Sequence, residues 1–303
     1  MSSKLVLVLL CCLLMASCLT ILPFRFWWIG PLTSFHLQLF FCNLIAVALC
    51  WKKRRLAAVF ALACCAHGFI LAPSFLGHAR FEPHQDDVRL MVSNVLTSNT
   101  SYAEFLEVVH ETNPDVLILV EISQLWLDAL QPLEASFPYR ISHPRSDNFG
   151  IAMWSRLPLD GKVRYFDSRL PSIAATLGTE QPFTIVATHP MPPISKRALR
   201  SRNAQLQSIA AFAAECKTPV VVAGDLNAAS WSPALRAMCA TGSLQSAAHG
   251  WAPTWPVHQF FLWIPLDHIL HSEDIGVSDF DNLDSVGSDH YPIYADLRPL
   301  GFD

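Results

Sequence analysis

Acidic side chains are missing from the first quarter of this sequence: no Asp or Glu occurs before Arg80, whereas six basic residues do. Charged residues make up only 15% of the whole chain, against about 25% in a typical soluble protein. A chain with so few charged residues cannot expose its whole length to water, so we expect part of it to lie in lipid. The rest of the chain holds 15 basic and all 25 acidic residues, a formal net charge of −10.

The acidic part of the chain also lacks clustered lysine and arginine on the scale that non-specific nucleic-acid binding requires. Proteins that grip duplex DNA regardless of sequence neutralise phosphates with many basic side chains and are basic as domains. A domain with a net charge of −10 is therefore not expected to bind duplex DNA tightly in this way.

No Cys-x-x-Cys motif occurs among the nine cysteines, which excludes a zinc ribbon. Seven of the nine lie in the apolar N-terminal region, where cysteine acts as a small hydrophobic residue. The other two, Cys216 and Cys239, could form one disulfide in an oxidising compartment or remain two buried thiols. The sequence leaves both alternatives open.

The N-terminal region contains three apolar runs of the length that crosses a bilayer. They are Leu5–Leu22, Phe35–Trp51 and Leu56–Leu76. The basic cluster Lys52–Arg55 separates the second run from the third, and the positive-inside rule places such a loop in the cytoplasm. Residues 1–80 are therefore predicted to be a membrane anchor of about three helices. Residues 81–303 are predicted to be a catalytic domain on the far, extracytoplasmic side.

A competing interpretation makes the first apolar run a cleaved signal segment. The stretch Met15–Cys18 resembles a degenerate lipoprotein cleavage site, whose cysteine would carry lipid. Both interpretations leave the catalytic domain on the same side of the membrane.

Residues 81–303 alternate between strand and helix patterns after a polar linker, Phe81–Asp87, without internal repeats. The predicted strands are Val88–Asn94, Asp115–Val120, Gly150–Ser155, Thr184–Thr188, Pro219–Ala223, His268–His271 and Ile293–Leu297. The predicted helices are Ser101–Thr112, Gln124–Ala135, Arg197–Cys216 and Pro233–Thr241. Mixed α and β elements with polar residues at strand ends are typical of a layered α/β sandwich.

Short polar motifs lie just before or just after several of these apolar strands. They are Glu121, Thr188-His189, Gly224-Asp225-Leu226-Asn227, Asp267-His268 and Ser288-Asp289-His290. Metal-assisted phosphoester hydrolysis needs such residues, because one carboxylate holds a divalent cation, another activates water and an Asp-oriented histidine meets the charge on the phosphorane. Each motif alone has an ordinary structural explanation, such as a turn, a solvated loop carboxylate or a packed histidine. His268 is expected to be structural.

Together with Asn94, these motifs resemble the endonuclease/exonuclease/phosphatase superfamily in residue type and in order along residues 88–298. The resemblance implies a four-layer α/β/β/α sandwich of the DNase I type, with a Mg²⁺ site for which Mn²⁺ is an alternative. The N-terminal runs resemble those of bacterial inner-membrane members. That similarity implies a multi-pass inner-membrane protein with a periplasmic catalytic domain.

The resemblance also implies a role for each matching residue. Metal binding falls to Glu121, with support from Asn94 and Asp289. Catalytic roles fall to His189 as transition-state stabiliser, Asp225 on the attacking water, Asn227 on the phosphate, and the pair Asp267 and His290. A substrate contact is also implied for Asn148, which precedes a strand that lines the site in relatives. Apart from the resemblance, the basic run Lys196, Arg197, Arg200 and Arg202 after His189 is either a solvated helix face or a source of one phosphate contact, for which Arg202 is our candidate.

The expected activity is hydrolysis of a phosphodiester, or of a phosphomonoester, in a nucleic acid or a phospholipid headgroup. The aromatic stretch Trp251–Trp263 is either core or a rim that enters the bilayer and admits lipid. A calcineurin-like phosphoesterase is excluded because the Gly-Asn-His element it requires is missing. A membrane scaffold that retains the fold without activity is the non-enzymatic alternative. No obligate protein partner is inferred.

Overall fold

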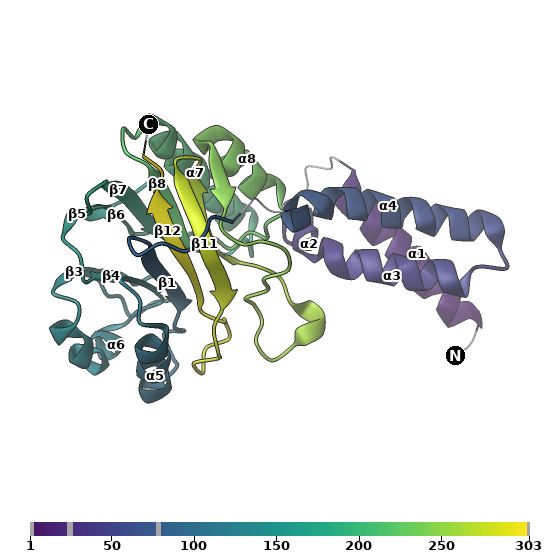
Figure 1. Cartoon of the computed structure of the whole chain (residues 1–303). Helices are drawn as coiled ribbons and strands as arrows, with labels where there is room; N and C mark the ends of the chain where they lie inside the picture. Colours follow the sequence, from purple (N-terminus) through teal and green to yellow (C-terminus); the bar gives the residue numbers. More distant parts are fainter. Residues whose placement is uncertain (1–2, 23–26, 77–79, 302–303) are drawn as a thin grey trace.

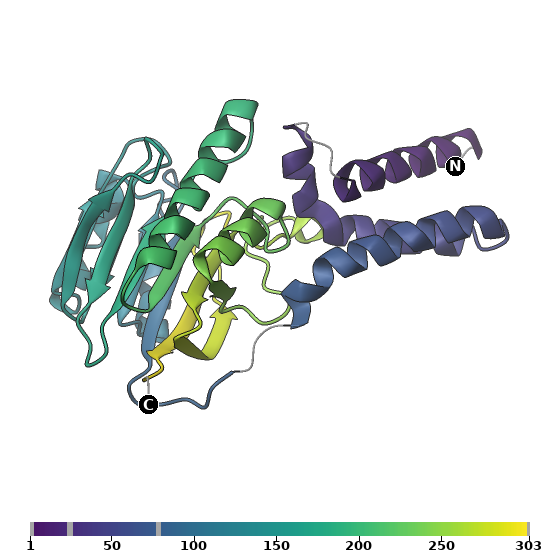
Figure 2. The same ribbon diagram turned by 90° about the horizontal axis from the view of Figure 1, so that it is seen from above.

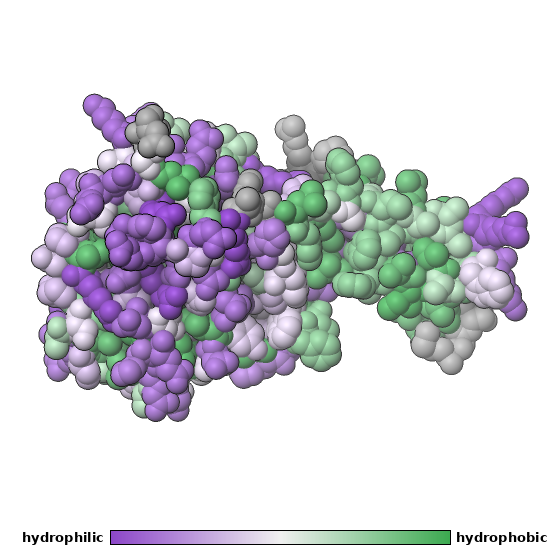
Figure 3. Space-filling view, viewed as in Figure 1, coloured by the Kyte–Doolittle hydropathy of each residue, from purple (hydrophilic) through white to green (hydrophobic). Residues whose placement is uncertain are grey.

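The protein consists of a helical bundle joined to an α/β body (Figures 1 and 2). This arrangement comes from a computed structural model that describes residues 3–22, 27–76 and 80–301. The bundle projects from one end of the body, and its surface is mainly apolar, whereas the body is mainly hydrophilic (Figure 3).

Two six-stranded mixed sheets form the centre of the body. The first has the order β11-β12-β1-β2-β4-β3, with bounds Ile275–Asn282, Ile293–Pro299, Val88–Asn94, Val116–Val120, Ile151–Ser155 and Tyr139–His143. The second has the order β5-β6-β7-β8-β10-β9, with bounds Leu159–Arg164, Ser172–Leu177, Phe183–Thr188, Val220–Asp225, Asp267–Ser272 and Leu244–Ser246.

Helices cover the outer faces of both sheets. The first sheet carries α5 (Tyr102–Thr112), α6 (Gln124–Ala129) and η2 (Gln131–Ala135). The second carries α7 (Lys196–Glu215) and α8 (Pro233–Gly242). A third apolar cluster fills the space between the two sheets. The four-layer α/β/β/α sandwich expected from the sequence is thereby confirmed.

The central strands are buried on both faces, which explains why their sequences are almost wholly apolar. All five residues of β2 are buried, with Leu117 and Leu119 facing the helices and Ile118 facing the other sheet. A strand covered on both sides reads as a continuous apolar run rather than as an alternating one.

Five strands were not predicted, and each has a weak local pattern. The edge strand β5 is largely polar, and β6 contains Ser, Thr and two Ala. The remaining three, β3, β9 and β11, are partly exposed or short. Their pairing with neighbouring strands, rather than their own apolar content, stabilises them. The helix predicted over Gln124–Ala135 divides at Leu130, before Pro132 in η2.

Two parallel strand pairs align the ends that carry the polar motifs. Strand β1 runs parallel to β2, and β7 runs parallel to β8. At the end of β8, Gly224 has φ +141°, and a Cβ atom there would collide with the carbonyl oxygen of Thr188 in β7. Glycine is therefore required for the close approach of the strands that deliver His189 and Asp225.

Three helices of the bundle are long and apolar enough to cross a membrane. These are α1 (Ser3–Ile21), the combined stretch Ile29–Leu49, which contains α2 (Ile29–Leu32), η1 (Thr33–Phe35) and α3 (His36–Leu49), and α4 (Arg54–Leu76). Buried polar contacts join them, from Asn43 to Ser17 at 2.9 Å and between the Nδ1 atoms of His36 and His67 at 2.8 Å. The loop between α3 and α4 lies at the end of the bundle far from the body (Figure 1).

The near end of the bundle packs directly on the body. Leu71 of α4 shares a buried cluster with Trp231, Ile264 and Leu266. The indole nitrogen of Trp231 donates to the carbonyl oxygen of Thr33 at 3.0 Å. The bundle and the body therefore share part of their apolar core, which the sequence did not indicate.

The two cysteines of the body remain free thiols. Both Cys216 and Cys239 are half-buried in the apolar cluster beneath α7 and α8. Of the two alternatives that the sequence left open, the structure has the unbridged one.

Candidate active site

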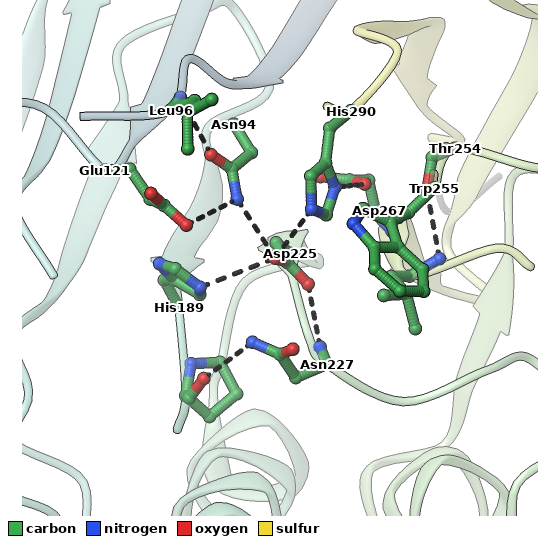
Figure 4. Close-up of polar contacts among 12 residues, drawn as sticks. Asn94, Leu96, Glu121, His189, Asp225, Asn227, Thr254, Trp255, Asp267 and His290 are labelled. Carbon is green, nitrogen blue, oxygen red and sulfur yellow. Dashed lines mark hydrogen bonds and ion pairs between the residues drawn. The ribbon is translucent and has the colours of Figure 1, made fainter. Parts of the chain in front are cut away.

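The polar residues predicted at strand ends converge at one edge of the two sheets (Figure 4). Asn94 closes β1, Glu121 follows β2, His189 follows β7 and Asp225 closes β8. Asp267 opens β10, which runs antiparallel to β8, so that Asp267 lies directly opposite Asp225. The strand directions therefore explain why residues far apart in the sequence meet here.

Asn94 joins the carboxylates that come from different sheets. Its Nδ2 atom donates to Oε1 of Glu121 at 3.0 Å and to Oδ2 of Asp225 at 3.1 Å. Its Oδ1 atom accepts from the backbone N–H of Leu96 at 3.1 Å, which fixes the orientation of the amide. In this structure Asn94 thus presents its nitrogen, rather than its oxygen, to the two acids.

Asp225 lies at the centre of the cluster and is 2% exposed. Its Oδ2 atom is 3.4 Å from Nε2 of His189 and 3.7 Å from Nε2 of His290. The backbone N–H of Asn227 donates to its Oδ1 atom at 2.9 Å. Burial alone would raise the pKa of Asp225, but the two histidines and this hydrogen bond outweigh it and lower the pKa. Asp225 is therefore ionised at neutral pH.

Asp267 orients His290. The Nδ1–H group of His290 donates to Oδ2 of Asp267 at 2.7 Å, which leaves Nε2 facing Asp225. Burial opposes a charged imidazole, but Asp267 and Asp225 raise the pKa of His290 to about 10. The hydroxyl of Thr254 accepts from the backbone N–H of Asp267 at 3.1 Å and so positions the start of β10. His290 is thus a cation, and Nε2, the ring nitrogen that is not bonded to Asp267, points into the cluster.

His189 is the second buried histidine of the cluster. Burial again opposes protonation, yet the hydrogen bond and charge of Asp225 raise the pKa of His189. Its Nδ1 atom has no hydrogen-bond partner among the described residues. The ring of Phe149 lies against the imidazole, with ring centres 5.5 Å apart.

Glu121 is a buried acid whose basic neighbours in the cluster are the two histidines, His189 and His290. It is 8% exposed, and no lysine or arginine of the described residues forms an ion pair with it. Burial is the main reason that its pKa is raised. Its backbone has φ +62°, a conformation uncommon for a residue other than glycine. Such strain is often retained at functional sites.

The donor set of the cluster fits a hard divalent cation. Mg²⁺ prefers carboxylate and water oxygens, and the burial of the Glu121 carboxylate is only partly offset by His189, Asn94 and His290, so its pKa stays raised. A separate group, Asp225, Asp267 and His290, offers ligand atoms that lie within 4.8 Å of one another, and neither Glu121 nor Asp289 belongs to this group. A bound cation would offset the negative charge of the buried carboxylates at this edge.

Comparison with known proteins decides the family. The sequence model of the Endonuclease/Exonuclease/phosphatase family matches residues 91–290, well over half of the chain. The chain belongs to this family. The match begins in β1 and ends on His290, so it includes all the residues of the cluster. No curated protein matches the sequence.

Solved structures of the family share the fold of the body. The human Nocturnin catalytic domain with bound sulfate is 21% identical, with a TM-score of 0.59 over 73% of this chain and 96% of that one. D. rerio TDP2 complexed with single strand DNA product is 15% identical, with a TM-score of 0.57 over 71% and 100%. Sphingomyelinase C from Streptomyces griseocarneus is 18% identical, with a TM-score of 0.53 over 69% and 99%.

Arg202, which the sequence offered as a substrate contact, is buried in this structure and bonded to the backbone of the loop after β8. It is 5% exposed, and its Nη1 atom donates to the backbone carbonyl oxygen of Asn227 at 2.7 Å. The side chain of Asn227 in turn donates to the carbonyl oxygen of Pro190 at 3.0 Å. Arg202 therefore supports the loop that carries Asn227, because its guanidinium is already engaged beneath that loop.

Two further predicted residues lie outside the cluster. Asn148 is exposed in the loop before β4, where its neighbour Phe149, rather than Asn148, contacts His189. The carboxylate of Asp289 accepts from the indole nitrogen of Trp255 at 3.0 Å and does not belong to the group of possible metal ligands. In this structure Asp289 is thus a partner of Trp255.

Several contributing residues carry no signal in the sequence. Thr97 donates from its hydroxyl to the carbonyl oxygen of Glu121 at 2.8 Å, and Trp255 positions Asp289. Thr97 is an ordinary loop threonine, and Trp255 is one of nine tryptophans. His268, by contrast, is structural as expected: its Nε2 atom lies 2.8 Å from the carbonyl oxygen of Ala228, away from the cluster.

Proposed function

We propose that this chain is a membrane-anchored, divalent-metal-dependent phosphoesterase. The observation that carries the proposal is the convergence of three buried carboxylates and two buried histidines at one sheet edge, centred on Asp225. Family membership supports the same reaction class, since nucleases and phosphatases both hydrolyse phosphoester bonds.

Glu121 is the proposed principal metal ligand, with Mg²⁺ as the metal and Mn²⁺ as the alternative. When bound, the cation would stabilise charge on the phosphoryl oxygens and lower the pKa of coordinated water. Asn94 holds Glu121 and Asp225 in register from opposite sheets. Asp289 would join the metal site only after its carboxylate leaves Trp255.

Asp225 is the proposed acceptor for the attacking water. Because its pKa is lowered, it stays ionised and orients the water through a hydrogen bond. Asn227 is proposed to hold the phosphate through its side-chain amide. His189 is proposed to stabilise the charge that develops on the phosphoryl oxygens, because its raised pKa favours the charged form.

His290 is the proposed acid of the site. Its pKa of about 10 keeps it protonated at neutral pH, and Asp267 fixes the ring so that Nε2 faces the cluster. From that position it can donate a hydrogen bond to the phosphoryl oxygen or a proton to the leaving group.

The proposed organisation is an anchor at residues 1–80 and a catalytic domain at residues 81–303. The loop with Lys52 and Lys53 lies at the opposite end of the bundle from the catalytic domain (Figure 1). The positive-inside rule then supports a cytoplasmic loop and a periplasmic catalytic domain in the inner membrane.

Hydrolysis of bis-p-nitrophenyl phosphate by the full-length protein in detergent tests the proposal. We expect Mg²⁺-dependent turnover that falls by about 10²–10⁴-fold in Asp225→Ala and His290→Ala. Asp160→Ala and His110→Ala are matched controls, because both residues are exposed on other parts of the body. A folded protein without metal-dependent turnover would instead support a scaffold that retains the fold without activity.

A further inference from the structure

An exposed aromatic turn lies between the proposed active site and the membrane anchor. The turn is η3 (Phe260–Leu262), in which Phe260 is 74% exposed and Phe261 is 62% exposed. In Figures 1 and 2 the yellow-green segment before β10 projects beside the end of the bundle that meets the body. Exposure of two adjacent phenylalanines to water is costly, so their position next to apolar helices needs an explanation.

The turn contacts a helix that is itself a candidate membrane span. The side-chain amide of Gln38 in α3 donates to the carbonyl oxygen of Trp263, directly after η3, at 2.9 Å. Gln38 lies within the apolar stretch Ile29–Leu49. If that stretch crosses the membrane, residues 260–263 lie alongside it rather than in bulk water.

Part of the backbone of the turn is hydrogen-bonded internally. The N–H groups of Leu262 and Trp263 donate to the carbonyl oxygens of Gln259 and Phe260, and that of Ile264 donates to Trp255. A segment that enters lipid must satisfy such groups internally, because hydrocarbon offers no partner. These three N–H groups therefore keep their hydrogen bonds when the two phenyl rings enter the bilayer interface.

A second apolar projection lies on the anchor side of the site. Ile194 is 77% exposed in the loop that follows His189, and the exposed residues Lys196 and Arg197 come directly after it. A Cβ atom on Gly30 of α2 would lie 3.3 Å from Leu199, so the start of α7 packs close to the anchor. An apolar tip followed by basic residues is typical of a segment that rests on a membrane surface.

Both projections are connected to the proposed catalytic residues by short segments. The loop that carries η3 begins at Trp255, whose indole binds Asp289 and whose ring centre is 6.5 Å from that of His290. The same loop ends at Asp267, the partner of His290. The loop with Ile194 starts at His189. Residues that would touch lipid thus lie within a few positions of residues that would touch a phosphate.

We infer that the substrate is a phosphoester of a lipid that remains in the bilayer, and that Phe260, Phe261 and Ile194 enter the membrane surface beside the site. This inference rests on the proposed function. Water adds its oxygen to phosphorus, one P–O ester bond breaks, and the leaving oxygen takes a proton. The products are an alcohol and a phosphomonoester, one of which keeps the acyl chains. The acidic part of the chain from Arg80 onward, with a net charge of −10, is poorly suited to a nucleic-acid backbone.

The test uses the full-length protein in nanodiscs of phosphatidylethanolamine and phosphatidylglycerol with Mg²⁺. Two rates are measured: hydrolysis of soluble bis-p-nitrophenyl phosphate, and release of phosphomonoester or alcohol from the lipids by mass spectrometry. The variant is Phe260→Ser/Phe261→Ser. The matched control is Leu125→Ser, because Leu125 is 70% exposed on α6, far from the bundle.

We expect the double variant to lose about tenfold or more of its lipid turnover, since two phenyl rings no longer enter lipid. Its hydrolysis of the soluble diester should stay within about twofold of the wild-type rate, because neither ring belongs to the proposed catalytic cluster. Leu125→Ser should change neither rate. A direct measurement is photo-crosslinking from Phe261→benzoylphenylalanine, which should label lipid, whereas Tyr139→benzoylphenylalanine at the opposite sheet edge should not.

The outcomes separate this inference from the function on which it rests. If the wild-type protein leaves the soluble diester intact, the proposed phosphoesterase activity fails, and the lipid substrate fails with it. If the soluble diester is hydrolysed but the lipids are not, while single-stranded DNA or RNA is, the inference alone is overturned. Equal lipid turnover in the double variant and in the wild type would overturn the role of the turn.

Discussion

The Nδ1 atom of His290 lies 2.7 Å from Oδ2 of Asp267, and the opposite ring nitrogen faces Asp225 across 3.7 Å. This imidazole is thus held between two buried carboxylates. The pair Asp267–His290 orients the ring, and the second contact directs its charge toward the site. His290 is thus oriented by Asp267 and directs its charge toward Asp225, so a substitution at Asp267 should affect both properties of the ring.

Asp267→Asn should lower the pKa of His290 from about 10 toward 6.5, because the variant removes one of the three carboxylate charges that raise it and the hydrogen bond to Nδ1. In the metal-free wild-type protein, this raised pKa stabilises the fold fully below pH 6.5, and the contribution is lost as pH rises toward 10. The Tm difference between wild type and variant should therefore be largest at pH 6.5 and below. Histidine chemical shifts measure the pKa directly. The exposed Asp160→Asn is the control, and an unchanged His290 titration would refute the assignment.

Glu121→Gln should abolish the stabilisation that Mg²⁺ confers. Because burial raises the pKa of Glu121, the ionised carboxylate destabilises the metal-free fold above pH 4.5, and the amide should restore part of that stability. We expect the variant to have a Tm at least as high as the wild type without metal, and to show no rise on adding MgCl₂. Glu104→Gln, at an exposed position on α5, should behave as wild type. A retained Mg²⁺-dependent rise would exclude Glu121 as the principal ligand.

Arg202→Met should reduce kcat by about 10–100-fold, because the loop of Asn227 loses the guanidinium that holds its carbonyl oxygen at 2.7 Å. The Mg²⁺ dependence should not change, since Arg202 contacts neither Glu121 nor Asp225. The matched control is Arg200→Met on the same helix, where the side chain is exposed. Equal rates for the two variants would show that Arg202 does not position the loop.

Removal of residues 1–80 should destabilise the catalytic domain. Truncation would expose Trp231, Ile264 and Leu266, which the end of α4 covers in the full-length protein. We expect a lower Tm and detergent-dependent aggregation, measured by thermal unfolding and light scattering.

In the full-length protein, Leu71→Ala should cost about 2–5 kcal/mol in the free energy of unfolding. Leu62→Ala, at a position 73% exposed on the same helix, should cost much less. A truncated domain as stable as the full-length protein would contradict the shared core.

The sequence was sufficient for the central strands because each of them is buried on both faces and therefore apolar at nearly every position. Strands β1, β2, β7 and β8 all have this pattern, and each is followed by, or ends on, a polar residue. The polar residues were recognisable as candidates for the same reason: a carboxylate such as Glu121 directly after five buried apolar residues is not explained by packing. Edge strands such as β5 carry no such signal, since their stability comes from a neighbour.

The positions of Arg202, Asp289 and Asn148 could not be read from family order, because order along the chain does not specify the direction of a side chain. Arg202 and Asn227 are 25 positions apart, and only the packing of α7 against β8 brings the guanidinium beneath the loop. Similarly, the indole of Trp255 competes for Asp289 across 34 positions.

The sequence by itself determined the contrast between an apolar, cationic N-terminal region and an acidic α/β remainder, and the set of polar residues at its strand ends. These properties follow from local composition and from hydrophobic runs of strand or span length. The tertiary structure alone decided that Asn94 bridges two sheets, that Arg202 lies beneath Asn227, and that the anchor packs against the loop between Trp255 and Asp267. Such contacts join residues that are tens or hundreds of positions apart, and they form only when the sheets pair and the bundle packs on the body.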